Sequence, residues 1–386
     1  MNRHFLRDIA DIQTGPFGSQ LHKEDYVDIG TPIVTVEHLG NRVFTEQNLP
    51  KVSDEDKARL SKYVLKEGDI VFSRVGSVDR CSYVDAAHDG WMFSGRCLRV
   101  RPNTEVDSLY LYYFFCLEDT KQFVRNIAVG ATMPSINTKL LGEVEVAYPS
   151  QTEQQKIVAL LSALDDKIEI NQKINDNLQQ QAAALFANFY DQAETEVGFT
   201  EMIQILGGGT PKTGESSYWN GDIPFFTPKD VGFPYTLTTE KTITEEGLAH
   251  CNSRLYPINT VFVTARGTVG KVGLPGVPMA MNQSCYALVG KDTHQLLVYF
   301  YTLKAVDRLK HKASGAVFDA ITTRDFEAEN IMKLSDDDTK AFLDVAEPIY
   351  QAVLNNSIEN LRLSELRDSL LPKLMNGEID VTDIRL

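Results

Sequence analysis

Two stretches of the chain carry apolar residues at the spacing of a coiled-coil helix. In the first, residues 151–192, apolar or small side chains recur at alternating steps of four and three, and Asn171 and Asn175 fill the two missing places. The series is Ile157, Leu161, Leu164, Ile168, Leu178, Ala182, Leu185 and Phe189. Thr152 followed by Gln155 is typical of a capping box. No Gly or Pro interrupts the stretch, and the series over Gln151–Tyr190 therefore predicts one helix of about 38 residues, roughly 57 Å long.

The second helical stretch is residues 336–378, with the helix itself expected over Asp337–Asn376. Three aspartates at its start suit the positive end of a helix, and Gly377 after Asn376 is a good stop. Its apolar stripe is Leu354, Ile358, Leu361, Leu366 and Leu370. Pro348 and Pro372 are expected to kink or interrupt it, because proline lacks the amide hydrogen that a helix interior uses.

Each helix must pack its stripe on something, and the other helix is the simplest partner. Asn171 and Asn355 sit in similar settings, so paired buried asparagines could fix the register at some cost in stability. Alternatively, both lie on a solvated edge, and the sequence favours neither interpretation. If the helices run antiparallel, the globular parts lie at opposite ends, related by a pseudo-two-fold axis.

The parts of the chain outside the helices form an internal repeat. Both are rich in short Val, Ile, Phe and Thr segments punctuated by Gly and Pro, as expected of β-strands. Residues 32–40 match 224–232, residues 70–78 match 261–269, and residues 130–139 match 315–324. The offsets of 192, 191 and 185 residues drift slowly, as in a duplication with loop insertions and deletions.

The pattern predicts an α+β protein with two similar β-rich domains separated by two long helices. The expected segments are a first domain at 1–150, a central helix at 151–192, a second domain at 193–335, a distal helix at 336–378 and a tail at 379–386.

The charge of the chain argues at first against a nucleic-acid partner, because the net value is −15. Residues 151–192 carry −3 of this and residues 336–386 carry −6, so the rest of the chain carries only −6. Local basic loops therefore remain compatible with the composition. No long apolar run predicts a membrane span, and the N-terminus has no apolar leader. The five scattered cysteines form no C-x-x-C pair, which favours a cytoplasmic location.

A search for catalytic or metal-binding motifs finds none that holds. Residues 267–271 resemble a phosphate loop but fail its spacing, and the histidines form no H-x-x-x-H pair. Glu55, Asp56 and Lys57 resemble a nuclease E-x-K but lie in a stretch typical of a helix start, so changes there should leave function intact. The glycine run at 207–209 lacks the dinucleotide-binding pattern. The sequence predicts no catalytic site and no cofactor of its own.

The repeats instead offer Gly-rich loops with donors that suit phosphates and base edges. The candidate DNA-binding residues are Ser19, Gln20, His22, Lys23, Arg74, Ser77, Arg80, Thr132 and Asn137 in the first repeat, and Thr210, Lys212, Thr213, Lys229, Arg266, Thr268, Lys271, Thr322 and Arg324 in the second. Each of these loops could also be an ordinary solvated β-turn.

At this point the chain resembles the DNA-specificity (S) subunits of Type I restriction-modification systems over essentially its whole length. The most specific stretches are residues 151–168 in the central helix and residues 366–379 in the distal helix. Residues 15–19 and 68–74 are similar to common variants within the globular parts.

The resemblance implies two target-recognition domains, each binding one half of a bipartite site in double-stranded DNA, with the helices setting the spacer. It implies two methyltransferase (M) subunits docked on the helices and restriction/translocase (R) subunits beside them, with S-adenosylmethionine, ATP and Mg²⁺ on those partners. The residues expected to pack the helices or dock subunits are Ile157, Leu161, Leu164, Ile168, Asn171, Leu178, Leu185, Leu354, Asn355, Ile358, Leu361, Leu366 and Leu370. The alternative is a coiled-coil scaffold that binds only proteins.

Overall fold

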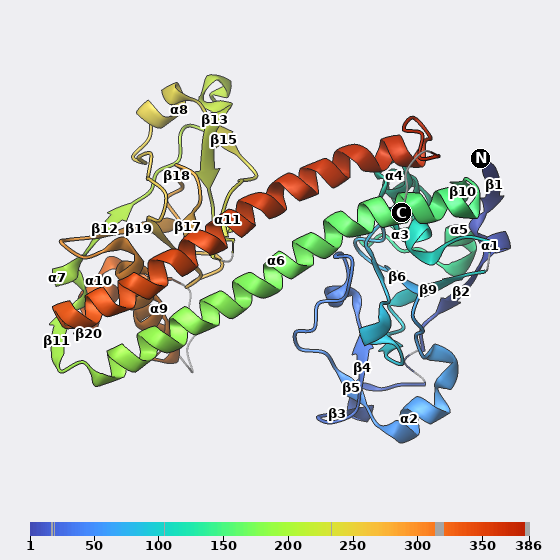
Figure 1. The fold of residues 1–386 in the computed structure, drawn as a ribbon, viewed down its shortest axis with the longest axis horizontal. Helices are drawn as coiled ribbons and strands as arrows, with labels where there is room; N and C mark the ends of the chain where they lie inside the picture. The colour runs from blue at the N-terminus through green and yellow to red at the C-terminus, as the bar shows by residue number, and fades with distance from the viewer. Residues whose placement is uncertain (17, 19, 104, 233, 313–319, 383–386) are drawn as a thin grey trace. The chain divides into compact units, whose positions relative to one another are not determined.

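The chain folds into two compact units, seen in a computed structural model that describes residues 1–16, 18, 20–103, 105–232, 234–312 and 320–382 (Figure 1). Unit 1 consists of Met1–Asp166 and Leu363–Leu386, and unit 2 of Lys167–Arg362. Both boundaries fall inside the long helices, so each unit contains one globular domain and part of each helix. The five segments expected from the sequence separate domains from helices. The two units instead group the residues that pack against one another, so each helix is divided between them.

Unit 1 is built around the antiparallel sheet β2-β9-β6-β7, with a second sheet β3-β5-β4-β8 and the pair β1-β10. Its strands are β1 (Asn2–Phe5), β2 (Ala10–Thr14), β3 (Tyr26–Val27), β4 (Thr31–Val34), β5 (Lys51–Val52), β6 (Ile70–Ser73), β7 (Cys81–Tyr83), β8 (Met92–Phe93), β9 (Cys97–Pro102) and β10 (Glu145–Tyr148). Its shorter α-helices are α1 (Leu6–Ile9), α2 (Asp54–Arg59), α3 (Ser108–Cys116), α4 (Glu118–Ile127) and α5 (Thr138–Gly142).

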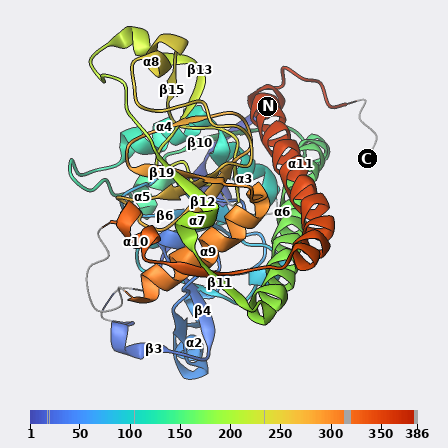
Figure 2. The same ribbon diagram turned by 90° about the vertical axis from the view of Figure 1, so that its left-hand side faces the viewer.

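Unit 2 has a sheet of order β12-β19-β16-β17-β14, a second sheet β15-β13-β18 and the pair β11-β20. Its strands are β11 (Thr195–Gly198), β12 (Ile203–Gly207), β13 (Trp219–Phe226), β14 (Tyr235–Thr236), β15 (Thr242–Ile243), β16 (Val261–Thr264), β17 (Val272–Pro275), β18 (Ala280–Met281), β19 (Cys285–Gly290) and β20 (Asn330–Lys333). Its shorter α-helices are α7 (Phe199–Met202), α8 (Glu245–Ala249), α9 (Gln295–Lys312) and α10 (Thr323–Glu327). In the view of Figure 2, unit 2 faces the reader.

The two units share one topology, which confirms the predicted duplication. The antiparallel order β2-β9-β6-β7 recurs as β12-β19-β16-β17, and the terminal pair β1-β10 recurs as β11-β20. The parallel pair β4-β8 recurs as β13-β18, with β5 and β15 on the other side. In the third sequence match, residues 315–319 lie outside the described residues.

The first long helix, α6, runs from Gln151 to Gln192, as the apolar series predicted. Its cap lies two residues earlier than expected. The Ser150 hydroxyl accepts the Glu153 N–H at 3.4 Å, and the Glu153 carboxylate accepts the Ser150 N–H at 3.0 Å. The box predicted at Thr152 and Gln155 is therefore wrong, because both of these residues already lie within the first turns of the helix.

The second long helix, α11, runs without interruption from Asp336 to Met375. The break allowed for at Pro348 and Pro372 does not occur. Proline at 348 removes one backbone hydrogen bond, but buried side chains on both sides of it, including Phe342 and Tyr350, hold the neighbouring turns in the core of unit 2. The stop after the helix is confirmed, since Gly377 has a φ of +71°, which favours glycine.

In unit 2, α6 and α11 lie side by side and antiparallel (Figures 1 and 2), joined by polar contacts. Asn171 is 1% exposed and donates to Glu359 at 2.7 Å and to Asn360 at 2.8 Å. Asn175 accepts from the Asn356 side chain at 2.8 Å. Asn355 takes no part in these contacts: it is exposed, as in the second interpretation, and its amide oxygen accepts from Gln351 on the same helix. Amide side chains do face each other across the helices, but the partners are Asn360 for Asn171 and Asn356 for Asn175.

In unit 1, the two helices pack apolar faces together and are joined by an ion pair. Ile157 and Leu161 share a buried core with Leu371 and Leu374. Arg367 donates to Asp165 at 2.6 Å. Leu366, expected in the stripe, is instead 46% exposed.

The other residues of the two predicted stripes fall into two groups. Ile168, Ala182 and Leu354 are buried. Those at intermediate exposure are Leu164, Leu178, Leu185, Phe189, Ile358, Leu361 and Leu370.

Two equivalent cysteines open β9 and β19, and both are buried. Burial raises the pKa of the Cys97 thiol to about 12 and that of the Cys285 thiol to about 12. Since only thiolates attack disulfide reagents, about one thiol in ten thousand is reactive at pH 8. We expect both to resist 5,5′-dithiobis(2-nitrobenzoate) in the native protein, whereas the half-buried thiols of Cys116 and Cys251 react first and all react in urea. Equal rates for every thiol in the native state would contradict this.

Candidate nucleic-acid interface

In unit 2, four loop segments far apart in the sequence meet at one end of the sheet. The loop after β16 pairs with the segment before α10, because the Ile321 N–H donates to the Ala265 carbonyl at 2.9 Å. The Arg266 N–H donates to the Ser284 carbonyl at 3.2 Å, just before β19. The loop after β12 joins them, since the Gly209 N–H donates to the Met281 carbonyl at 3.1 Å.

These contacts bring most of the candidate residues of the second repeat into one cluster. Exposed side chains here are Lys212, Thr213, Arg266, Thr268, Lys271, Thr322 and Arg324. Across the described ranges of unit 2, no carboxylate forms an ion pair with any of the four basic residues in this set. The cluster therefore presents uncompensated positive charge, which an anionic backbone would neutralise.

Two threonines of this cluster already have partners within the protein. Thr210 donates to the Gln283 side chain. Thr322 caps α10, because its hydroxyl donates to Asp325 at 2.7 Å. Lys229, on the turn after β13, is 80% exposed, and its Nζ lies 3.8 Å from a Glu240 carboxylate oxygen.

Unit 1 gathers the equivalent loops in the same way. The Ile136 N–H donates to the Arg74 carbonyl at 3.0 Å, and the Gly76 N–H donates to the Pro134 carbonyl at 2.8 Å. Gly76 has a φ of +75°, matched by +81° at Gly267 in unit 2, so the two loops share a turn that favours glycine. The structure thus brings Arg74 and Ser77 close to the segment that carries Thr132 and Asn137.

Several candidate side chains of unit 1 are engaged internally. Arg74 donates to the Gly95 carbonyl at 3.1 Å, and Arg80 donates to the Leu39 carbonyl. Gln20 accepts from the Tyr63 hydroxyl at 2.7 Å.

The remaining candidates of unit 1 are placed as follows. Asn137 caps α5 by accepting from the Leu140 N–H at 2.9 Å. His22, Ser77 and Thr132 are exposed. Ser19 and the side chain of Lys23 lie outside the described residues.

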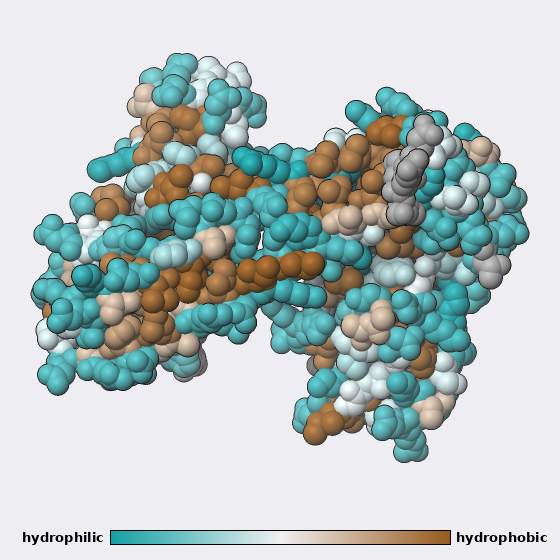
Figure 3. Space-filling view, viewed as in Figure 1, coloured by the Kyte–Doolittle hydropathy of each residue, from teal (hydrophilic) through white to brown (hydrophobic). Residues whose placement is uncertain are grey.

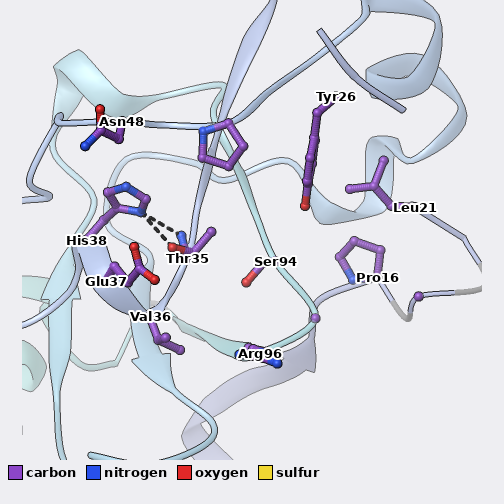
Figure 4. Close-up of a pocket in the computed structure, with 13 residues that line it drawn as sticks. Pro16, Leu21, Tyr26, Thr35, Val36, Glu37, His38, Asn48, Ser94 and Arg96 are labelled. Carbon is purple, nitrogen blue, oxygen red and sulfur yellow. Dashed lines mark hydrogen bonds between the residues drawn. The ribbon is translucent and has the colours of Figure 1, made fainter. Parts of the chain in front are cut away.

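A cleft of about 580 Å³ in unit 1 adjoins this cluster (Figure 4). Its lining includes Glu37, Ser94, Arg96, Tyr26 and Pro16. Burial, and to a smaller extent the charge of Asp25, raises the pKa of Tyr26, so its hydroxyl keeps its proton at neutral pH.

Sequence reasoning missed Arg96 and Glu37 of this cleft. Arg96 is exposed, and its carbonyl accepts the Arg74 N–H at 2.8 Å, which places it in the loop cluster. The repeat could have identified it, because the Ser284 carbonyl makes the same contact in unit 2, accepting the N–H of Ala265, the residue equivalent to Arg74, at 2.8 Å.

The stretch that resembles a nuclease motif forms helix α2. Ser53 caps this helix by accepting the Asp56 N–H at 3.1 Å, and Asp56 pairs with Arg59 at 2.6 Å. These carboxylates therefore stabilise a helix start, as the polar pattern suggested. Residues 267–271, similar to a phosphate loop, connect the antiparallel strands β16 and β17 rather than a strand and a helix.

Comparison with known proteins gives consistent matches. The specificity subunit of the HindI Type I restriction enzyme of Haemophilus influenzae is 25% identical, over 84% of this chain and 89% of that protein. The MjaIX specificity subunit of Methanocaldococcus jannaschii is 23% identical, over 98% and 93%. The crystal structure of a Type I restriction-modification S subunit from M. genitalium shares the fold, with a TM-score of 0.57, 16% identity and coverage of 97% and 95%.

A family model gives the same result on both repeats. The model described as the Type I restriction modification DNA specificity domain matches residues 2–180 and again residues 195–333. These two matches contain the loop clusters of unit 1 and unit 2 respectively. The chain therefore belongs to the family of Type I restriction-modification DNA specificity proteins.

Proposed function

We propose that this chain is the specificity subunit of a Type I restriction-modification complex, and that each of its globular domains binds one half of a bipartite DNA site. The observation that carries the proposal is the loop cluster built twice from equivalent segments, once in each unit. A duplicated binding surface fits a target in two parts. The names of the relatives, which are specificity subunits of Type I restriction enzymes, support the same assignment.

The loop clusters have the chemistry that duplex DNA requires. Arg is the commonest reader of guanine, and Lys neutralises phosphates. Arg266 and Lys271 stand on one short loop of unit 2, both exposed. The acidic helices do not oppose this, because in our proposal they face protein partners while the loops face DNA.

We further propose that catalysis belongs to partner subunits. Two methyltransferase subunits would carry S-adenosylmethionine, and restriction/translocase subunits would carry ATP and Mg²⁺, while this chain has no cofactor of its own. The long helices would set the distance between the half-sites. Among the described residues, none of the helices has the length and apolar character to cross a bilayer. A cytoplasmic location is part of the proposal.

Exposed apolar side chains on α6 support the docking of protein subunits. Ile170 is 52% exposed and Ile174 is 43% exposed, and a spacing of four places them on one face of the helix. Figure 3 shows an apolar strip between α6 and α11 in unit 2. Contiguous exposed apolar surface typically marks an interface. The same feature would serve a scaffold that binds only proteins, so DNA binding must be tested directly.

The first test is co-expression of the full chain with the methyltransferase encoded beside it, in a host without other adenine methylation. Sequencing of the host DNA is expected to show a bipartite motif that is methylated only when this chain is present. Exchange of residues 1–150 for the same segment of a relative should change one half-site and leave the other unchanged. A stable complex with no methylated motif would favour the protein scaffold.

Salt dependence gives an independent prediction for unit 2. Replacing Arg266 and Lys271 together by alanine is expected to lower the slope of log Kd against log salt concentration by about 0.9 for each phosphate contact that is lost. The matched control is Lys340→Ala, an exposed lysine on α11. Equal slopes for the wild type and the double variant would remove the loop after β16 from the proposed interface.

A further inference from the structure

One turn is built in the same way in both units and presents opposite charges. It follows β4 as Thr35–His38 and β13 as Thr227–Asp230. In unit 1, His38 Nδ1 accepts the Thr35 N–H at 3.0 Å and lies 3.0 Å from the Thr35 hydroxyl. In unit 2, one Asp230 oxygen accepts the Thr227 N–H at 2.8 Å and the Thr227 hydroxyl at 2.6 Å.

The fourth residue of each turn, His38 or Asp230, forms a further hydrogen bond that fixes the turn. His38 is 3% exposed, and its Nε2 lies 3.1 Å from the Gln47 carbonyl. Since Nδ1 accepts a backbone N–H, the proton is on Nε2 and the ring donates to Gln47. The second oxygen of Asp230 accepts the Glu240 N–H at 2.8 Å. The third residue is therefore held in place while its side chain points outward, and that residue is an acid in one unit and a base in the other.

The turns occupy equivalent places beside the loop clusters. The Ser94 N–H donates to the Val34 carbonyl in unit 1, and the Asn282 N–H donates to the Phe226 carbonyl in unit 2, both at 2.9 Å. In unit 1 the third residue is Glu37, which is exposed and lines the cleft with Arg96 (Figure 4). Within the described part of the chain, no cation or donor engages the Glu37 carboxylate.

A carboxylate in this position is informative because it can only accept hydrogen bonds. It is repelled by phosphates, so it weakens DNA binding unless it meets donors on the bases. In the major groove those donors are the amino groups N4 of cytosine and N6 of adenine. In unit 2 the equivalent Lys229 can only donate, and the major-groove acceptors are chiefly those of guanine.

We propose that Glu37 is a specificity-determining residue, which accepts a hydrogen bond from a cytosine or adenine amino group in the half-site bound by unit 1. This rests on the proposed function, because it requires that the cleft faces DNA. The fixed turn between Thr35 and His38 supplies a defined position for the carboxylate, which base discrimination requires.

The test uses the full chain with its methyltransferase partner and compares wild type, Glu37→Ala, Glu37→Gln and the matched control Glu55→Gln. Glu55 is an exposed acid of unit 1 on α2, away from the cleft. The methylated motif is determined for each. With Glu37→Ala we expect discrimination at one base pair of one half-site to fall by roughly 5- to 150-fold, while the other half-site and the Glu55→Gln motif stay unchanged.

A second measurement tests the hydrogen bond itself. Duplexes are made with a single purine for adenine, or a single 2-pyrimidinone for cytosine, at the position that Glu37→Ala relaxes. Both analogues lack the major-groove amino group. Wild type should bind the analogue more weakly than the natural base, whereas Glu37→Ala should bind both equally.

Three outcomes would overturn the proposal, and they can be told apart. An unchanged motif with Glu37→Ala, beside an intact wild-type motif, would reject the role of Glu37 and leave the proposed function standing. Equal strengthening of binding to all DNA sequences by Glu37→Ala would show that the carboxylate only repels phosphates. No bipartite motif with the wild-type chain would reject the proposed function, and the role of Glu37 with it.

Discussion

Replacing Asp165 by alanine is expected to destabilise unit 1 by about 3 kcal/mol. Asp165 is 5% exposed and joins α6 to two other elements, accepting from the Tyr113 hydroxyl at 2.6 Å and from Arg367 at 2.6 Å. The variant leaves the buried Tyr113 hydroxyl without its acceptor, and the partly buried Arg367 guanidinium keeps only its bonds to Asp368. The expected loss of stability lies at the low end for a broken buried ion pair, because the Arg367 side chain is 29% exposed and water can reach it.

The measurement is urea unfolding of unit 1 followed by tryptophan fluorescence. The chain has two tryptophans, Trp91 in unit 1 and Trp219 in unit 2, so a Trp219→Phe background reports on unit 1 alone. Glu145→Ala is the control, since Glu145 is 52% exposed and its partner Arg3 is 68% exposed, so that pair lies at the surface of unit 1. Equal shifts for the two variants would show that burial of Asp165 adds nothing.

Replacing Phe186 by alanine is expected to destabilise unit 2 by about 3–5 kcal/mol. Phe186 is 2% exposed on α6 and lies among aromatic rings of three segments. Its ring centroid is 4.9 Å from that of Phe300 on α9 and 5.5 Å from that of Phe342 on α11. The loss combines the transfer of the ring to water with the cavity that remains between the helices.

In this case a Trp91→Phe background isolates the signal of Trp219. Asn188→Ala on the exposed side of α6 is the control and should shift the midpoint by less than about 0.5 kcal/mol. Phe186→Leu should recover much of the loss, because it refills most of the volume. If leucine is as destabilising as alanine, ring packing rather than volume holds α6 to unit 2.

The long helices and the duplication could be predicted because both leave periodic traces in the sequence. The four-three spacing from Ile157 to Phe189 reflects which face of α6 is buried, and that is a local property. The strands β6 and β16 could be matched because each ends in a Ser or Thr followed by a fixed turn at Gly76 or Gly267. The pseudo-two-fold relation between the domains stays a prediction.

Contacts across the helices could not be predicted in the same way. Register depends on which residues of α11 meet α6 in three dimensions, so sequence similarity selected Asn355 when Asn356 and Asn360 make the contacts. The continuity of α11 through Pro348 likewise depends on tertiary packing that outweighs the local cost of proline.

The candidate interface was predicted at the level of loops more than of single residues. The structure brings the predicted loops together, but the side chains of Arg80 and Asn137 form hydrogen bonds with the backbone of the protein itself. Such bonds within the protein compete with contacts to a ligand, and the identity of the residue does not reveal them. Conversely, Glu37 in the sequence looks like any solvated acid, and only the turn that holds it sets it apart.

The assignment of the last helical turns to unit 1 has a consequence for synthesis on the ribosome. Leu371, Leu374 and Met375 complete the core against which Ile157 and Leu161 pack. Unit 2 ends at Arg362, before the last segment of unit 1 is synthesised, so unit 2 can complete its fold before unit 1 does. At typical elongation rates, the N-terminal part of unit 1 exists for roughly 10–40 s before the end of α11 is synthesised. During this time an apolar face of α6 is uncovered. Premature termination near the end of translation would therefore damage the domain made first.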